Sequence, residues 1–233
     1  FYRLVYLMAD FKKDKYEIIK KAIPKVLSEF AYNYLLIKKQ VAATMFYSNF
    51  LHKDQTEWGT FRDPQVPNTF AIYGDPAMEA LLLKTQPVVE KCINDKLLPT
   101  YSYARVYKKG DILQRHKDRI SCEISTTMNL GGDVWPIYLN PDPKAGHVYG
   151  KPRGIHKIQT YQPSTNKKEI KINLKPGDML LYSGCDLEHW REPFEGRDCA
   201  QVFLHYNRLS LGDKNIFDNR KHLGLPVDFK NKV

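Results

Sequence analysis

The feature that most constrains the fold is a change of pattern near residue 100. Before it, apolar residues recur at helical spacing after Pro24, and Asp75-Pro76 has the form of a helix start, with a capping carboxylate followed by proline. After it, the chain breaks into short apolar or alternating runs separated by turn residues, such as the KGD segment at 109–111. Helices followed by many short strands predict an α+β fold whose β part is a sandwich or barrel.

The elements on either side of this change can be placed approximately. Ser28 is the expected cap of the first helix, and Pro87 is expected to kink or split the second helix, which runs to about residue 93. Residues 16–22 fit either a strand or a helix start. The expected strands cover residues 100–107, 112–119, 122–130, 134–139, 169–174, 179–182 and 199–207.

Length and composition exclude several classes of protein. A chain of 233 residues, 42% of them hydrophobic, can build a sizeable core without a metal or a disulfide to hold it together. No apolar run approaches the ~20 residues of a membrane-spanning helix. The four cysteines form no C-x-x-C pair and no dense framework. We therefore expect free thiols and a soluble, cytoplasmic protein in a reducing compartment.

The net charge of +10 is unevenly distributed along the chain. The basic excess lies in residues 1–40, 141–168 and 208–233, whereas residues 169–207 hold more acidic than basic side chains. The segment 141–168 is also rich in Pro and Gly and is expected to be a solvated excursion from the strands. No RNA- or DNA-binding signature accompanies the basic segments, so nucleic acid is not an expected partner.

Three residues in the strand-rich part have the types and spacing of a metal site. His116 and Asp118 lie two apart in an expected strand, which points both side chains to one face. Further along, a PGD turn, an apolar run and a loop lead to His189. Two imidazoles and one carboxylate on one side of an ion leave its other positions open, as in the facial triad of non-haem Fe(II) oxygenases.

With these residues in place, the segments from 100 to 207 resemble the Fe(II)- and 2-oxoglutarate-dependent dioxygenases, especially the prolyl-4-hydroxylase-like branch. The resemblance lies in the order of YARVYKKGD, H-x-D, STTMN, P-G-D and a distal histidine. It implies a double-stranded β-helix, or jelly-roll, flanked by N-terminal helices. Residues 1–233 would then form one domain, with a helical support region at 1–99, a catalytic core at 100–207 and a C-terminal tail at 208–233.

The resemblance also implies an activity and its cofactors. Such an enzyme hydroxylates a C–H bond of a peptidyl proline or another small substrate, consumes O2, and converts 2-oxoglutarate to succinate and CO2. Fe(II) would be held by the triad, and the far carboxylate of 2-oxoglutarate by Arg197, with Tyr107 and Thr127 presenting hydroxyls to it. Arg197 lies slightly earlier after the distal histidine than is usual for the family, so Arg191, Arg119 and Arg115 remain alternatives.

Other interpretations of the same residues stay open. Glu188 beside the distal histidine is the poorer carboxylate ligand, because neighbouring strand residues face opposite ways. His205 is expected to pack at the end of a sheet or to line the pocket, and the 141–168 excursion could form a substrate-binding lid. The chain could also be a non-catalytic jelly-roll metal-binding or structural module, or a cupin-type metal enzyme that uses no 2-oxoglutarate. The primary substrate and the oligomeric state are not fixed by the sequence.

Overall fold

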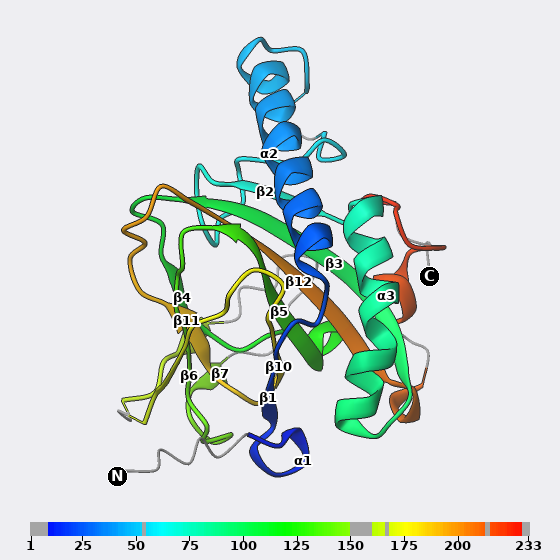
Figure 1. The fold of residues 1–233 in the computed structure, drawn as a ribbon, viewed down its shortest axis with the longest axis vertical. Coiled ribbons are helices and arrows are strands. Elements are labelled where there is room, and N and C mark those ends of the chain that lie inside the picture. Colours follow the sequence, from blue (N-terminus) through cyan, green and yellow to red (C-terminus); the bar gives the residue numbers. More distant parts are fainter. Residues whose placement is uncertain (1–8, 53–54, 150–159, 166–167, 213–214, 230–233) are drawn as a thin grey trace.

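The structure is a computed structural model that describes residues 9–52, 55–149, 160–165, 168–212 and 215–229 (Figure 1). Its strands form two antiparallel sheets, a six-stranded major sheet and a four-stranded minor sheet, together with a separate two-stranded pair. In spatial order the major sheet holds β1 (Tyr16–Ile19), β10 (Met179–Ser183), β5 (Ile124–Gly132), β12 (Asp198–Arg208), β3 (Leu97–Lys108) and β2 (Phe70–Tyr73).

The minor sheet is built from shorter strands and faces the inner side of the major sheet (Figure 1). Its order is β4 (Leu113–His116), β11 (His189–Arg191), β6 (Ile137–Leu139) and β9 (Ile170–Ile172). The helices are α1 (Phe11–Asp14), α2 (Lys25–Tyr47) and α3 (Pro76–Ile93), with short 3-10 turns η1 (Ile120–Cys122), η2 (Leu209–Leu211) and η3 (Ile216–Asn219). This arrangement confirms the expected α+β fold with a jelly-roll core and flanking helices.

Helix α3 begins as the sequence predicts. The Asp75 carboxylate accepts hydrogen bonds from the backbone N–H groups of Ala77 and Met78, which the first turn leaves unpaired. The helix then continues through Pro87 instead of splitting there. Pro87 and Leu83, whose carbonyl the proline leaves without an intrahelical donor, both lie on the exposed side, so water can bond that carbonyl.

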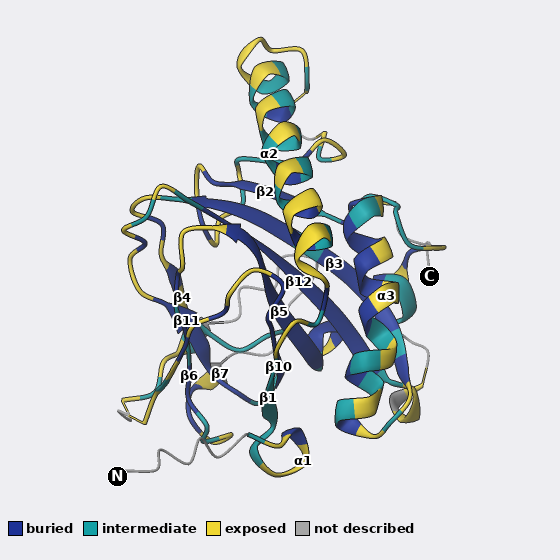
Figure 2. Ribbon diagram, viewed as in Figure 1, coloured by how far each residue is buried: buried dark blue, intermediate teal, exposed yellow. Residues whose placement is uncertain are grey.

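Helix α2 begins earlier than predicted. Its first residue is Lys25, directly after Pro24, and Ser28 lies inside the helix with no capping role. The Ser28 hydroxyl is buried and donates to the carbonyl oxygen of Leu130 at 2.8 Å, which ties the helix to β5. In Figure 1 the C-terminal half of α2 extends beyond the sheets, and in Figure 2 most of its residues there are partly buried or exposed.

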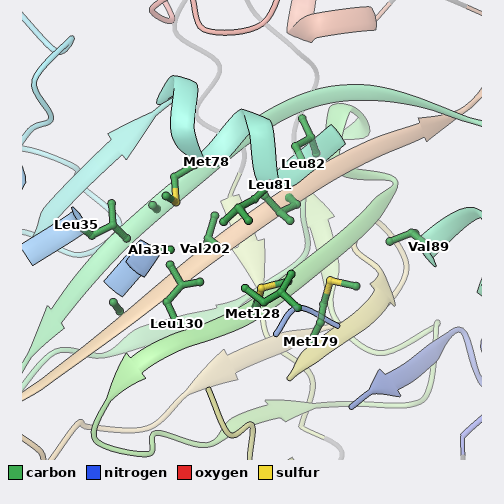
Figure 3. Close-up of a cluster of buried hydrophobic side chains, with 14 of the residues drawn as sticks. Ala31, Leu35, Met78, Leu81, Leu82, Val89, Met128, Leu130, Met179 and Val202 are labelled. Carbon is green, nitrogen blue, oxygen red and sulfur yellow. The ribbon is translucent and has the colours of Figure 1, made fainter. Parts of the chain in front are cut away.

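The main hydrophobic core lies between the helices and the outer face of the major sheet. Alternate residues of the central strands, such as Met128, Leu130 and Val202, pack against Leu35 and Leu82 of the helices (Figure 3). Because side chains alternate along a strand, the residues between them face the minor sheet. The inner face of the major sheet is therefore where polar residues of the central strands gather.

The region before residue 100 also contributes strands. Of the segment that fitted either a strand or a helix start, residues 16–19 form strand β1, whereas β2 was not expected. β1 pairs with β10, with Tyr16 opposite Tyr182, and β2 pairs with β3, with Phe70 opposite Val106. These two strands extend the major sheet on both sides and are its edge strands. The N-terminal region thus completes the sheet as well as covering it.

Within the basic excursion at 141–168, β7 (His147–Tyr149) pairs antiparallel with β8 (Thr160–Gln162). Residues 161 and 164 of this segment bind Glu188 on the minor-sheet side. The Glu188 carboxylate accepts hydrogen bonds from the Tyr161 hydroxyl at 2.8 Å and the Ser164 amide at 2.9 Å. The predicted lid includes residues 150–159, which lie outside the described residues, and it stays a prediction.

Two expectations from composition can be compared with this fold. In the part of the chain that the structure describes, no helix is long and apolar enough to cross a membrane. All four cysteines are free thiols, two of them buried on the inner side of the molecule near strands β5 and β12.

Candidate metal centre and its pocket

The three predicted metal ligands come together between the two sheets. His116 at the end of β4 is paired in register with His189 at the start of β11. Asp118 Oδ1 lies 3.7 Å from His116 Nε2 and 3.5 Å from His189 Nε2. All three ligand atoms lie within 4.8 Å of one another, a separation that one ion can bridge.

Both imidazole rings are held with Nε2 facing this point. His116 Nδ1 lies 2.7 Å from the carbonyl oxygen of Gln114, and His189 Nδ1 lies 3.0 Å from that of Leu187. A carbonyl oxygen can only accept, so each Nδ1 carries the proton and each Nε2 keeps its lone pair. Metal-ligating histidines in proteins are usually fixed in this way, and this donor set therefore fits a divalent metal.

Asp118 lies beyond β4, which ends at His116, and not within the strand where it was expected. Its backbone N–H donates to the carbonyl oxygen of Gly184 at 2.9 Å, and its Oδ2 accepts from the Ser125 hydroxyl at 2.7 Å. A Cβ at position 184 would overlap both Asp118 Oδ2 and the carbonyl oxygen of Cys122, so only glycine fits there. These contacts leave Oδ1 directed at the two histidines.

The local electrostatics act differently on the three groups of the triad. Burial, assisted by the neighbouring His189, lowers the pKa of His116 to about 4. Although burial raises the pKa of Asp118, His189 and His116 outweigh it and hold that pKa below its usual value. Burial also opposes protonation of His189, but the Asp118 carboxylate raises the pKa of that imidazole. At neutral pH the site therefore presents an ionised carboxylate and at least one neutral imidazole.

Arg191 lies on the same face of β11 as His189, two residues further along. It is 1% exposed, and its guanidinium donates through Nη1 to the carbonyl oxygen of Trp135 and through Nη2 to Thr127 Oγ1 at 3.4 Å. Among the described residues, its Nε has no hydrogen-bond partner and no carboxylate pairs with it. Burial lowers the pKa of Arg191, which is the expected response of a desolvated cation that lacks an anion.

Two further predicted residues accompany this cation. The Tyr107 ring packs edge-on against Trp135 at 4.7 Å between centroids, and the guanidinium of Arg191 lies 5.1 Å from the same indole ring. Thr127 contacts Arg191 directly and is fully buried. The structure thus gathers Tyr107, Thr127 and Arg191, one of the alternative cations, at the same end of the inner face.

Arg197, the cation predicted first, does not join this group. Its side chain is 87% exposed and pairs with the neighbouring Asp198 at 2.8 Å on the surface. The residue lies in the turn before β12, where its amide donates to the Asp133 carboxylate, so its side chain is outside the sheet interior. The structure therefore does not bring Arg197 to the inner face as expected, because the residue lies in the exposed turn and β12 begins only at Asp198.

The other two alternatives are held by acidic partners. Arg119 forms a two-point ion pair with Asp218 of η3, at 2.7 and 2.8 Å. Arg115 lies over the Trp190 ring at 3.4 Å and contacts Glu188 at 3.5 Å. Both arginines already have anionic partners, unlike Arg191.

The triad opens into a cavity of about 240 Å³. Besides the three ligands, its lining has an apolar part and a polar part. The apolar part includes Leu113, Ile137, Tyr182 and Phe203, and the polar part carries Asp63, Gln65, Tyr101, Tyr103, Arg105 and His205.

Comparisons with known proteins match this chain by structure only. No family model and no curated protein matches its sequence. EctD from S. alaskensis with bound Fe superposes with a TM-score of 0.60 at 15% identity, over 97% of this chain and 84% of that one. HygX from Streptomyces hygroscopicus, with nickel, 2-oxoglutarate and hygromycin B bound, has a TM-score of 0.55 at 14% identity, covering 95% and 92%.

The chain has the fold of the 2-oxoglutarate-dependent oxygenases. A third neighbour, the non-heme alpha ketoglutarate dependent epimerase SnoN from nogalamycin biosynthesis, has a TM-score of 0.55 at 11% identity, over 87% of this chain and 82% of that one. Identities of this size carry the fold alone. The prolyl-4-hydroxylase-like branch stays a prediction.

Within this oxygenase fold, the sequence did not single out four residues that shape the pocket. Ser125 and Gly184 secure Asp118, and Arg105 lines the cavity together with Asp63. For Arg105 a signal was present, because it is a charged residue two positions before Tyr107, on the same face of an expected strand. For Ser125 the signal was the polar STTMN run, whereas nothing local marks Gly184 or Asp63.

Proposed function

We propose that this protein is an Fe(II)- and 2-oxoglutarate-dependent dioxygenase. It hydroxylates a C–H bond of a peptidyl proline or another small substrate and converts 2-oxoglutarate to succinate and CO2. The observation that carries the proposal is the convergence of His116 Nε2, His189 Nε2 and Asp118 Oδ1 on one point, with the cavity on the open side. Such a set holds an ion and leaves other positions for exogenous ligands.

The side chains around this point have separate roles. His116, Asp118 and His189 would hold Fe(II), which with 2-oxoglutarate and O2 supplies the oxidising chemistry when bound. Arg191 would bind the far carboxylate of 2-oxoglutarate, since it is a buried cation without an anion, and a guanidinium offers a carboxylate two parallel donors. The hydroxyls of Tyr107 and Thr127 would complete that subsite. The sheets themselves exclude water.

No protein acid or base is assigned. The two ligand histidines are fixed by backbone carbonyls, and the remaining polar groups of the inner face would bind and orient ligands. In this proposal the chain contributes position, charge and exclusion of solvent, and the chemistry belongs to the metal and its cosubstrate.

The proposal is tested by adding Fe(II) and then 2-oxoglutarate to the protein without oxygen. Chelation of the iron by 2-oxoglutarate gives a weak visible charge-transfer band, which we expect in wild type and not in His116→Ala. A band that is absent from wild type, or unchanged in His116→Ala, would contradict the proposal.

Release of succinate separates an enzyme from a binding module. With O2 present, the dioxygenase forms succinate, slowly alone and faster with its substrate. A jelly-roll module that keeps the metal without turnover would give the anaerobic band and no succinate under either condition.

A further inference from the structure

A second buried arginine lies in the wall of the metal pocket. Arg105 is on the inner face of β3, two residues before Tyr107, and is 3% exposed. Its Nη2 donates to Asp63 Oδ2 at 2.5 Å and to Gln65 Oε1 at 2.8 Å. Both acceptors come from the segment that precedes β2. The pair therefore joins the jelly-roll to a neighbouring loop, and all three residues line the cavity.

This ion pair is poorly explained by stability alone. Removing two charges from water has a large desolvation cost, and a buried pair of this kind is often no more stabilising than well-packed apolar residues. The strand that carries Arg105 has apolar residues on its other face, which already supply packing against the helices. A charged pair on the cavity wall therefore suggests recognition of something inside the cavity.

Some N–H donors of the Arg105 guanidinium lack a good acceptor among the described residues. Its Nη1 reaches only the Tyr107 hydroxyl, at 3.5 Å, and its Nε has no hydrogen-bond partner among the described residues. Guanidinium carries five N–H donors, and buried donors without acceptors are unusual in native proteins. An anionic group in the cavity would satisfy them.

The same cavity also offers acceptors. Asp63 is ionised, since Arg105 and the Tyr103 hydroxyl hold its pKa below the usual value although burial raises it. His205 Nδ1 lies 3.0 Å from Ser125 Oγ, whose other partners, Asp118 Oδ2 and the carbonyl of Cys122, can only accept. Ser125 therefore donates to one of those oxygens and accepts from His205 Nδ1–H, which leaves His205 Nε2 as an acceptor.

The size of the cavity limits what these groups can bind. Pockets for drug-sized ligands measure roughly 300–1,000 Å³. The cavity of about 240 Å³ is smaller, and the metal with the chelating end of 2-oxoglutarate would occupy part of it. What remains suits a molecule of a few heavy atoms with both charges close together.

We propose that the substrate is a free α-amino acid, or a zwitterion of similar size, whose carboxylate is bound by Arg105 and whose ammonium group lies at Asp63. The wall carries one positive and one negative side chain side by side. A zwitterion can place its carboxylate at the positive one and its ammonium group at the negative one. The inference rests on the proposed function for the reaction that follows, but substrate binding can be measured without turnover.

The first test uses wild-type protein loaded with Ni(II) and 2-oxoglutarate, so that nothing is consumed. The twenty L-amino acids are titrated in a calorimeter, followed by the primary amide and the decarboxylated amine of each one that binds. We expect at least one amino acid to bind, and its amide and amine to bind about 10- to 100-fold more weakly, since each lacks one charged partner. Equal binding of acid and amide, or no binding by any amino acid, would overturn the proposal.

The second test assigns the recognition to Arg105. In Arg105→Gln the acid and the amide should bind equally, whereas Arg62→Gln, on the same loop as Asp63 but facing Phe46, should discriminate as wild type does. Discrimination that survives in Arg105→Gln overturns the assignment. If that variant does not fold, Asp63→Asn serves instead. Because it removes the proposed partner of the ammonium group, it should bind the ammonium-free acid as well as the amino acid. It should keep part of the preference for the amino acid over the decarboxylated amine, because Arg105 remains.

Failure of this inference can be distinguished from failure of the proposed function. A wild-type protein that forms the anaerobic Fe(II)–2-oxoglutarate band, but binds no amino acid or instead oxidises a peptide with blocked termini, loses only the substrate assignment. A protein that forms no band loses the proposed function, whatever it binds.

Discussion

The two faces of the major sheet are made by the same strands and differ in nearly every chemical property. On β12, Val202 and Leu204 point outward into the apolar cluster under α2 and α3. Their neighbours Gln201 and His205 point inward, where Gln201 contacts Thr127 and His205 lines the metal pocket. Every second residue of this strand thus packs in the core, and the residues between them face the site.

This difference shows how stability and chemistry can be separated within one element. The outer face buries apolar area, which is the dominant favourable contribution to folding. The inner face buries polar groups, and some of them, such as Arg105 Nε and Arg191 Nε, have no hydrogen-bond partner within the described part of the chain. Buried polar groups of this kind oppose folding unless a ligand satisfies them. Changes to the outer face should therefore act on unfolding, and changes to the inner face on ligand binding.

The largest expected effect is the loss of a metal ligand on the inner face. His189→Ala removes one of three ligand atoms, and we expect affinity for Fe(II) to fall more than about 100-fold, beyond what loss of a supporting hydrogen bond causes. Anaerobic Fe(II) titration measures it. Fe(II) affinity equal to that of wild type would contradict the assignment of His189 as a metal ligand.

The matching change on the outer face should act on stability instead. Leu204 is fully buried between β12 and the helices. We expect Leu204→Ala to lower the free energy of unfolding by about 2–5 kcal/mol, the usual cost of such a cavity. The protein that remains folded should give the same Fe(II)–2-oxoglutarate band, measured beside chemical denaturation. A variant that keeps its stability but loses the band would contradict the claim that the outer face acts on stability and the inner face on ligand binding.

A smaller effect is expected where the inner face supports a ligand without touching the metal. Ser125→Ala removes the donor to Asp118 Oδ2, and affinity for Fe(II) should fall about 10- to 100-fold. Ser28→Ala is the matched control, because it deletes a buried serine hydroxyl on the outer side. It should cost about 1 kcal/mol of stability and leave metal affinity unchanged. Equal effects of the two variants on metal affinity would contradict the separation of the faces.

The smallest effect concerns pH. The pKa of Asp63 in the folded protein lies below its usual 3.8, because Arg105 and Tyr103 outweigh the effect of burial. A lowered folded pKa adds stability above the unfolded value, and that stability is lost as the pH falls through the folded one. The difference in unfolding free energy between wild type and Asp63→Asn should thus be constant from pH 7 to about 5 and shrink below about 4. Denaturation of both proteins across this range measures it, and a difference that grows on acidification would contradict the sign.

The parts of the site that the sequence predicted are those set by local pattern. His116 and Asp118 are two residues apart, and His189 follows a turn and an apolar strand, so their approach needed only the jelly-roll topology. The start of α3 at Asp75-Pro76 was likewise a local signal. The alternation of β3, β5 and β12 determined which residues face inward.

The parts that the sequence could not predict depend on turns and distant segments. Whether Arg197 reaches the interior depends on where β12 begins, and a shift of one residue along a strand reverses the face. Asp63 meets Arg105 only because its loop returns across the sheet, and Gly184 is required only because Asp118 packs against it. Contacts of this kind leave no periodicity in the chain.

The central claim is that inward charges bind ligands and outward charges do not, and the two arginines that follow the distal histidine test it most directly. Fe(II)-loaded wild type, Arg191→Gln and Arg197→Gln are titrated anaerobically with 2-oxoglutarate while the visible band is followed. We predict that Arg191→Gln raises the half-saturating concentration about 10- to 100-fold, from the loss of charge-assisted hydrogen bonds, and that Arg197→Gln leaves it unchanged. A shift in Arg197→Gln with none in a folded Arg191→Gln would contradict the account.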